Sequence, residues 1–177
     1  ATLARLIGDQ YRVLLIEKRR LSDQSDGFSA IKCCGGLLAP DAQMMLSKLG
    51  LGLPKSVLED PQLFVVKSID LHQGLERYYQ RHYINMNRKK FDSWLLSLVP
   101  PNVDIRTNCR LKSYASEDNY FKLAFVHQKR NFVEKAKILI GADGAKSKIR
   151  AHSCPQGLYP QKYVAIQEWV ERKNDFP

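Results

Sequence analysis

The sequence predicts a mixed α/β fold that combines part of a parallel βαβ unit with antiparallel strands. A helical pattern over residues 1–8 precedes a continuous apolar run over residues 12–17, as in a parallel sheet buried on both faces. Short strand-like segments separated by polar turns follow from residue 103 and indicate an antiparallel meander. The chain has 177 residues, 44% of them hydrophobic, so a core can form without metal or disulfide staples.

The first elements are predicted by apolar spacing and by their stop signals. Leu3, Leu6 and Ile7 share one helical face, and Gly8 ends the helix. After a turn, residues 12–17 (RVLLIE) form the buried strand, which ends in Glu17. A helix followed by a buried strand is half of a βαβ unit.

The middle of the chain is predicted to hold two helices and one hairpin. Residues 21–31 form a loop that leads into the Cys-Gly-Gly segment, and Pro40, Gly50, Gly74 and Pro100 mark ends of the elements that follow. The predicted helices cover residues 40–49 and 88–99, and the predicted hairpin strands cover residues 63–71 and 75–86.

The last third is predicted to be mostly strand. Meander strands over residues 103–136 feed a buried strand at residues 137–140. A short helix over residues 145–151 follows, and residues 163–170 form one further strand.

Composition narrows the class of function. The net charge is +10, and residues 101–150 contain eleven Lys and Arg against five Asp and Glu. The excess fits a solvated face, a phosphate-bearing cofactor or a lipid head group, whereas no nucleic-acid motif accompanies it. The four cysteines show no C-x-x-C spacing, so neither a metal site nor a disulfide framework is predicted. Without a membrane span or signal peptide, a cytoplasmic protein is expected, with peripheral membrane association kept as an alternative.

Glu17 is the first candidate site residue. In a dinucleotide-binding βαβ unit, an acid at the end of the second strand accepts hydrogen bonds from the adenosine ribose hydroxyls. It stands about 20 residues after a Gly-rich turn. That turn would precede Ala1. A strand-ending Glu is also common by chance.

Two further segments carry candidate chemistry. Asp143 lies in Gly-Ala-Asp-Gly (residues 141–144), where small residues let backbone and carboxylate approach a sugar or phosphate. The alternative is a tight turn whose Asp caps the next helix. Residues 32–36 (KCCGG) place two thiols beside two glycines, and the alternative there is a loop with inert thiols.

The order and spacing of these segments resemble the flavoprotein family of geranylgeranyl reductases and para-hydroxybenzoate-hydroxylase-like monooxygenases. The resemblance spans the chain through Glu17, the KxCGG stretch, Arg88 with Phe91-Asp92, and GADGAxSxxR. The KxCGG stretch favours the reductase branch. The family's GxGxxG strand and turn and its later Gly-Asp motif are absent, so the sequence is interpreted as a fragment of a longer oxidoreductase.

The resemblance implies a Rossmann-like FAD-binding domain with a β-meander and part of an inserted antiparallel substrate-domain sheet. It assigns residues 1–60 and 87–160 to an incomplete FAD-binding domain and residues 61–86 and 161–177 to substrate-domain strands. The cofactor-binding residues that it implies are Glu17, Lys18, Arg19, Cys33, Cys34, Gly35, Gly36, Arg88, Leu111, Asp143 and Gly144, with Cys34 also as the catalytic candidate.

The function implied is reduction of carbon-carbon double bonds in a prenyl or other hydrophobic small molecule, with FAD as cofactor and NAD(P)H as electron donor. Two alternatives stay open: an FAD-dependent monooxygenase, and a non-catalytic remnant or basic interaction module.

Overall fold

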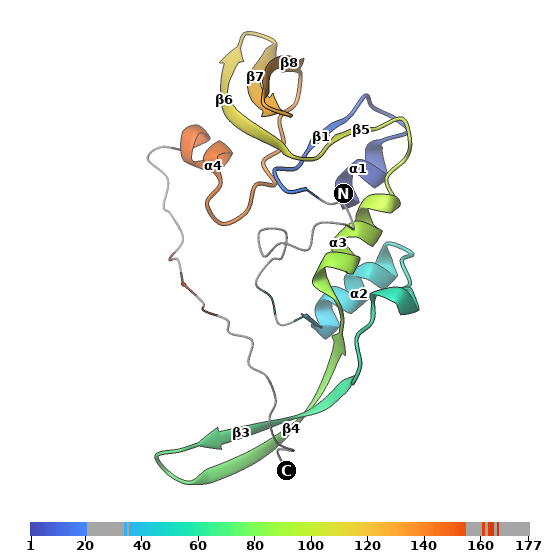
Figure 1. Ribbon diagram of the computed structural model, residues 1–177, viewed down its shortest axis with the longest axis vertical. Helices are drawn as coiled ribbons and strands as arrows, with labels where there is room; N and C mark the ends of the chain where they lie inside the picture. The colour runs from blue at the N-terminus through green and yellow to red at the C-terminus, as the bar shows by residue number, and fades with distance from the viewer. Residues whose placement is uncertain (21–33, 35, 155–160, 162, 165, 167–177) are drawn as a thin grey trace. The chain divides into compact units, whose positions relative to one another are not determined.

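The computed structural model describes residues 1–20, 34, 36–154, 161, 163, 164 and 166 (Figure 1). It divides into two compact units, Ala1–Asn108 and Cys109–Pro177. The predicted division into an FAD-binding domain (residues 1–60 and 87–160) and substrate-domain strands (residues 61–86 and 161–177) stays a prediction.

The first unit begins with the predicted half of a βαβ arrangement. Helix α1 (Thr2–Ile7) precedes strand β1 (Leu14–Ile16), which pairs in parallel with β5 (Asp104–Arg106). The parallel pairing is as predicted, but β1 is half-buried rather than buried on both faces. Among the described residues the β1 sheet has two strands, so β1 has one paired edge. A small hydrophobic core next to this strand pair is formed by the buried residues Ala4, Val99 and Val103.

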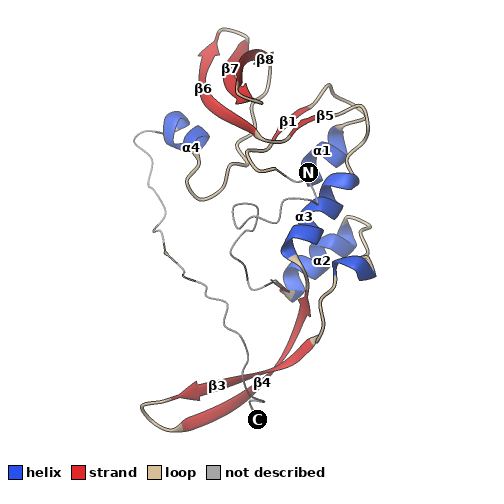
Figure 2. Ribbon diagram, viewed as in Figure 1, coloured by secondary structure: helices blue, strands red, loops and turns tan. Residues whose placement is uncertain are grey.

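Two longer helices and a 3-10 turn pack together in the same unit (Figure 2). Helix α2 (Pro40–Lys48) starts with Pro at its first position, where the missing amide costs nothing. The 3-10 helix η2 (Lys55–Val57) contacts α3 (Arg88–Ser97), whose N-cap Asn87 accepts a hydrogen bond from the Lys90 amide. Their shared core contains Leu38, Leu46, Val57, Met86 and Phe91.

An antiparallel sheet with the order β2-β4-β3 completes the first unit. The hairpin of β3 (Leu63–Asp70) and β4 (Leu75–Asn85) is confirmed, and β2 (Leu37–Leu38) pairs with the end of β4. Most hairpin side chains are exposed, including Phe64 and Tyr78 at 65% each. In Figure 1 the two long strands extend away from the helices of this unit.

The second unit is built on the predicted meander. Strands β6 (Cys109–Glu117), β7 (Tyr120–His127) and β8 (Arg130–Ala136) pair antiparallel in sequence order. Cys109, Leu123 and Phe125 are buried on one face of this sheet. Helix α4 (Lys148–Ser153) is held to β6 by Tyr114, whose hydroxyl donates to the Ile149 carbonyl oxygen at 3.1 Å.

Two predictions for the second unit are wrong. Residues 137–140 form no strand, and Ile138 and Ile140 are 71% and 53% exposed. A strand buried on both faces needs paired neighbours, and no described strand pairs with these residues. The helix predicted over residues 145–151 begins later, at Lys148, because the Ser147 side chain caps it there.

Other predictions fall partly or wholly outside the described residues. These are the loop over residues 21–31 and most of the strand over residues 163–170. Residues 163, 164 and 166 are described and are not in a strand. None of the described helices combines the length and the apolar character needed to cross a bilayer.

Candidate functional site

Glu17 lies at the carboxyl end of the parallel strand pair, where the sequence predicts it. Its amide donates to the Arg106 carbonyl oxygen at 3.0 Å, so it continues the β1–β5 ladder by one residue. Its side chain is 26% exposed. A carboxylate fixed at the end of a parallel strand and still open to solvent fits the role of a ribose-hydroxyl acceptor.

Arg19 folds back onto the Glu17 carboxylate. Its backbone amide and Nε donate to Oε1 at 2.9 and 3.2 Å, and its Nη2 donates to Oε2 at 3.2 Å. A carboxylate has about four lone-pair positions, and these bonds fix the orientation of Glu17. Lys18, between them, is exposed.

Asp92 on α3 links this strand end to the helix. Its Oδ2 accepts from Arg19 Nη1 at 3.1 Å, and its Oδ1 accepts from Arg88 Nε at 3.0 Å. Burial alone would lower the pKa of Arg19, but hydrogen bonds to Glu17 and Asp92 outweigh it and raise that pKa above its ordinary value. Glu17, Arg19, Asp92 and Arg88 therefore form one connected group of charges, called here the Glu17 cluster.

Asp92 was not predicted as a site residue. It appears in the sequence beside Phe91 in the motif behind the resemblance, and its i,i+4 spacing from Arg88 predicts their helical ion pair. Nothing local predicts its contact with Arg19. The Arg88 guanidinium lies 5.9 Å from the Phe91 ring centre, so the ring also holds it at the start of α3.

The described part of the Cys-Gly-Gly segment consists of Cys34 and Gly36, and Cys33 and Gly35 lie outside the described residues. Cys34 is a free, half-buried thiol. Gly36 has φ +72°, and a Cβ at this position would collide with the Met86 carbonyl oxygen. The Gly36 carbonyl oxygen accepts from the Met86 amide at 2.8 Å. Glycine is therefore required here to join this segment to the base of β4.

Leu111, Asp143 and Gly144 belong to the second unit. Leu111 is half-buried in β6 beside an irregularity in the strand register. The Asp143 carboxylate accepts from the Lys148 and Ile149 amides at 2.8 and 3.4 Å. This is the helix-capping arrangement that the sequence left open as an alternative.

The environment of Asp143 favours its ionised form. Burial acts to raise the pKa of Asp143, but hydrogen bonds from Ser147 and from the backbone outweigh burial and lower it. Gly144 has φ +84° with open space around it. The carboxylate is exposed, so capping does not close it off from a ligand.

The structure brings Glu17, Arg19 and Arg88 together and places Cys34 and Gly36 in the same unit. The other candidates, Leu111, Asp143 and Gly144, are in the second unit. That both sets contact one cofactor stays a prediction.

Comparison with known proteins gives two kinds of similarity, and no family model matches the chain. Protein CbrA of Shigella sonnei (strain Ss046) is 40% identical over 181 residues, which cover 100% of this chain and 49% of that protein. The chain thus spans about half the length of the curated relatives it matches.

Solved structures share the fold. A geranylgeranyl bacteriochlorophyll reductase-like protein from Thermoplasma acidophilum gives a TM-score of 0.65 at 19% identity, covering 82% of this chain and 36% of that one. Aklavinone-11 hydroxylase, solved with FAD and aklavinone, gives 0.64 at 19% identity, covering 86% of this chain and 32% of that one. The chain therefore has a mixed α/β fold found in FAD-binding flavoproteins.

Proposed function

We propose that this chain is part of an FAD-dependent oxidoreductase and that Glu17 binds the adenosine ribose. The observation that carries the proposal is the position of Glu17 after β1, at the carboxyl end of a parallel strand pair and behind helix α1. That is where a dinucleotide-binding unit places its ribose-binding acid. The fold similarity to a hydroxylase solved with FAD supports the same cofactor.

Each member of the Glu17 cluster has a distinct task in this proposal. The Glu17 carboxylate accepts the ribose hydroxyl hydrogens, and Arg19 holds that carboxylate in place. Arg88, oriented by Asp92, supplies positive charge for the ribityl-pyrophosphate part of the cofactor. Lys18 adds charge at the exposed edge. Leu111, Asp143 and Gly144 are proposed as the second unit's contacts with the same cofactor.

The proposed reaction is reduction of a carbon-carbon double bond in a prenyl or other hydrophobic substrate. Bound FAD would supply the redox chemistry, with NAD(P)H as the source of hydride. Cys34 is the residue proposed to deliver a proton to the alkene carbon opposite the one that receives hydride, since it is a free and partly accessible thiol. The KxCGG sequence and the reductase-like structural neighbour support this choice.

An FAD-dependent monooxygenase is the second candidate. The hydroxylase neighbour matches the chain with a TM-score of 0.64, almost the same as the reductase-like neighbour at 0.65. In a monooxygenase one oxygen atom would enter the substrate and the other would leave as water. The two candidates therefore differ in their need for molecular oxygen.

One experiment separates these functions. The full-length protein is purified, its bound flavin is identified after heat release, and the flavin is reduced with NAD(P)H in the absence of oxygen. Reoxidation by a prenyl substrate, with stoichiometric saturated product, supports the reductase. Substrate turnover that occurs with oxygen alone and gives a hydroxylated product supports the monooxygenase. Absence of flavin, and of flavin binding on titration, contradicts both and favours a non-catalytic protein.

A further inference from the structure

The exposed face of the β6-β7-β8 sheet carries a group of basic side chains. Neighbouring residues of a strand point to opposite faces, so burial of Leu123 and Phe125 places Lys122 on the outer face. The cross-strand partners of Lys122 are Ala115 and Lys135, which share this face. We name this surface the cationic face; its basic members are Arg110, Lys112, Lys122 and Lys135, all exposed.

The bonds described for these cations are to neutral groups. Lys112 Nζ donates to Asn131 Oδ1 at 3.0 Å, and Lys135 Nζ lies 4.4 Å from the centre of the Tyr120 ring. Among the described residues of the three strands, Glu117 is the one carboxylate on this face; it pairs with Tyr120 and is the diagonal neighbour of Lys122. Glu134 lies on the opposite face, because it pairs with Leu123. The face is therefore strongly positive.

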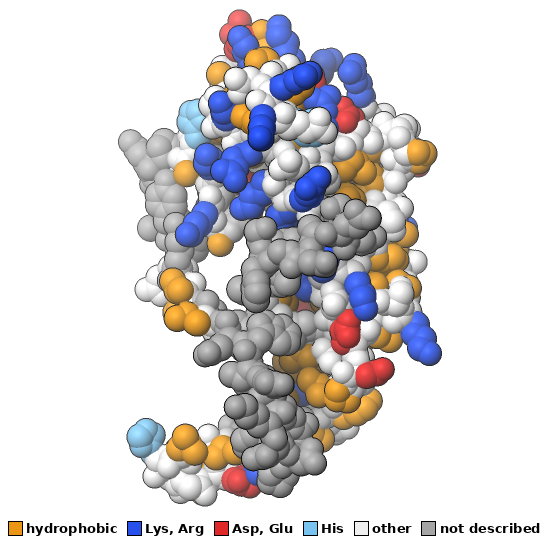
Figure 3. Space-filling view, in the orientation of Figure 1, with side chains coloured by type: hydrophobic (Ala, Val, Ile, Leu, Met, Phe, Trp, Pro, Cys, Tyr) orange, Lys and Arg blue, Asp and Glu red, His pale blue; other side chains and the backbone are white. Residues whose placement is uncertain are grey.

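Lys122 and Lys135 are direct cross-strand partners in the β7–β8 register. Like charges in directly opposite positions destabilise a sheet when nothing lies between them. An anionic surface above the sheet would offset this repulsion, because each lysine would be attracted to it. In Figure 3, basic side chains gather over the part of the molecule that these strands occupy in Figure 1.

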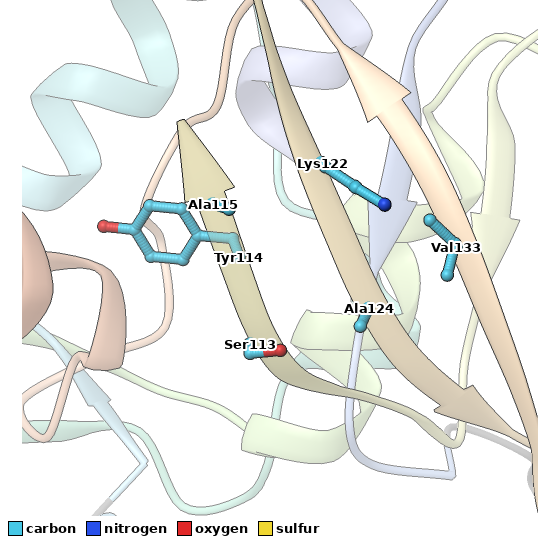
Figure 4. Close-up of a pocket in the computed structure, with 6 residues that line it drawn as sticks. All are labelled: Ser113, Tyr114, Ala115, Lys122, Ala124 and Val133. Carbon is cyan, nitrogen blue, oxygen red and sulfur yellow. The ribbon is translucent and has the colours of Figure 1, made fainter. Parts of the chain in front are cut away.

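The shape of the face excludes a deep ligand site. Beside Lys122 lies a shallow hollow of about 180 Å³ (Figure 4). Small-molecule sites occupy about 300 to 1,000 Å³. The floor consists of small side chains, and in Figure 4 the Lys122 and Tyr114 side chains point in different directions. The residues that line the hollow are Ser113, Tyr114, Ala115, Lys122, Ala124 and Val133.

We propose that the cationic face docks on a bilayer that contains anionic lipids. A broad, shallow sheet surface with three flexible lysines fits dispersed head-group charge, because a lysine ammonium is a point charge without the directional fork of arginine. A nucleic acid is less well matched. Of the aromatic rings on this face, Tyr120 is covered by Lys135, so it is not free to stack on a base.

The test uses the full-length protein and vesicles of phosphatidylcholine with or without phosphatidylglycerol. We expect co-sedimentation with the mixed vesicles, weakened by added salt, and little with phosphatidylcholine alone. The K122E/K135E variant should lose at least about tenfold in apparent vesicle affinity. It keeps two like charges opposite each other, and its fold is checked by urea unfolding. If that variant does not fold, K122Q/K135Q is used.

The control is K48E/K55E, which makes the same net charge change at two exposed lysines of the first unit. It should retain vesicle binding. An equal loss in the control would show that total charge, and not the cationic face, governs binding, and would overturn the proposal. So would absence of binding to mixed vesicles, including the case in which the protein binds a DNA duplex instead. None of these readouts depends on flavin, so they are independent of the proposed redox function.

Discussion

Arg19 Nη1 lies 3.1 Å from Asp92 Oδ2, although the two residues are 73 positions apart. This contact ties the end of β1 to helix α3. The side chains of Arg19 and Asp92 are 15% and 12% exposed, so water screens the pair less than it screens a surface ion pair. The orientation of Glu17 therefore depends on a residue far away in the sequence.

A double-mutant cycle between Arg19 and Asp92 measures this link. We expect a coupling free energy of about 1 to 3 kcal/mol in urea unfolding of the full-length protein, since a charged hydrogen bond is lost in either single variant. The Lys67–Glu76 pair on the exposed hairpin is the matched control and should show a smaller coupling. Equal coupling free energies in the two cycles would show that the Arg19–Asp92 pair stabilises the fold no more than an exposed ion pair does.

Substitution of two glycines tests the Cys-Gly-Gly segment. Gly36 and Gly50 both have left-handed backbone, with φ +72° and +67°, so Ala at either position should cost about 1 to 2 kcal/mol. Gly50 has open space around it, whereas at Gly36 an added Cβ meets the Met86 carbonyl oxygen. We expect Gly36→Ala to lower the urea midpoint clearly further than Gly50→Ala. Similar midpoints would show that the segment can move away from β4.

Protonation of Asp143 should loosen helix α4. The folded state lowers the pKa of Asp143, so its stabilising effect is present above the unfolded pKa of about 3.9 and is lost as pH falls through the folded value. Asp143→Asn should reduce hydrogen-exchange protection of the Lys148 and Ile149 amides about twofold to tenfold near neutral pH.

At acid pH, protection in the wild type should approach that in the Asp143→Asn variant. Asp118→Asn, at an exposed turn of the same unit, serves as the control and should leave α4 unaffected. If wild type and Asp143→Asn differ equally at all pH values, ionisation of Asp143 is not what holds the helix.

Cys34→Ser tests the proposed proton donor. The variant should keep its fold and flavin and lose about 10²-fold or more in flavin reoxidation by a prenyl substrate, measured by rapid mixing. Cys154→Ser changes an exposed thiol and should reoxidise at the wild-type rate. Undiminished flavin reoxidation in Cys34→Ser, together with lower stability, would show that Cys34 is a packing residue. The mechanistic reason to prefer the reductase would then be lost.

Elements with local signals were predicted well. Helix α3 begins at Arg88, as predicted from its apolar spacing, and ends before Pro100, which is a local stop signal. The β3–β4 hairpin and the meander were predicted for the same reason, since alternation and turn residues are local. The position of Glu17 at the strand end was likewise predicted from the apolar residues that precede it.

Features that depend on distant neighbours were not predicted. The run at residues 137–140 has the composition of a buried strand, but composition does not supply the paired strands that would bury Ile138 and Ile140. The capping role of Asp143 was one of two roles that the sequence allowed. The contact between Arg19 and Asp92 could not be predicted, because no local sequence pattern indicates it. Gly36 was predicted as a cofactor-binding residue, whereas its close contact with the Met86 backbone left no signal in the sequence.

FAD titration of the Glu17→Gln variant of the full-length protein, after flavin removal, tests the central claim most directly. Loss of charged hydrogen bonds to the ribose should weaken FAD binding by about 1 to 3 kcal/mol. Glu76→Gln, which removes an ion-paired carboxylate on the exposed hairpin, should bind FAD as the wild type does. FAD affinity unchanged in Glu17→Gln, in a variant that unfolds like the wild type, would contradict the assignment of Glu17 to the cofactor.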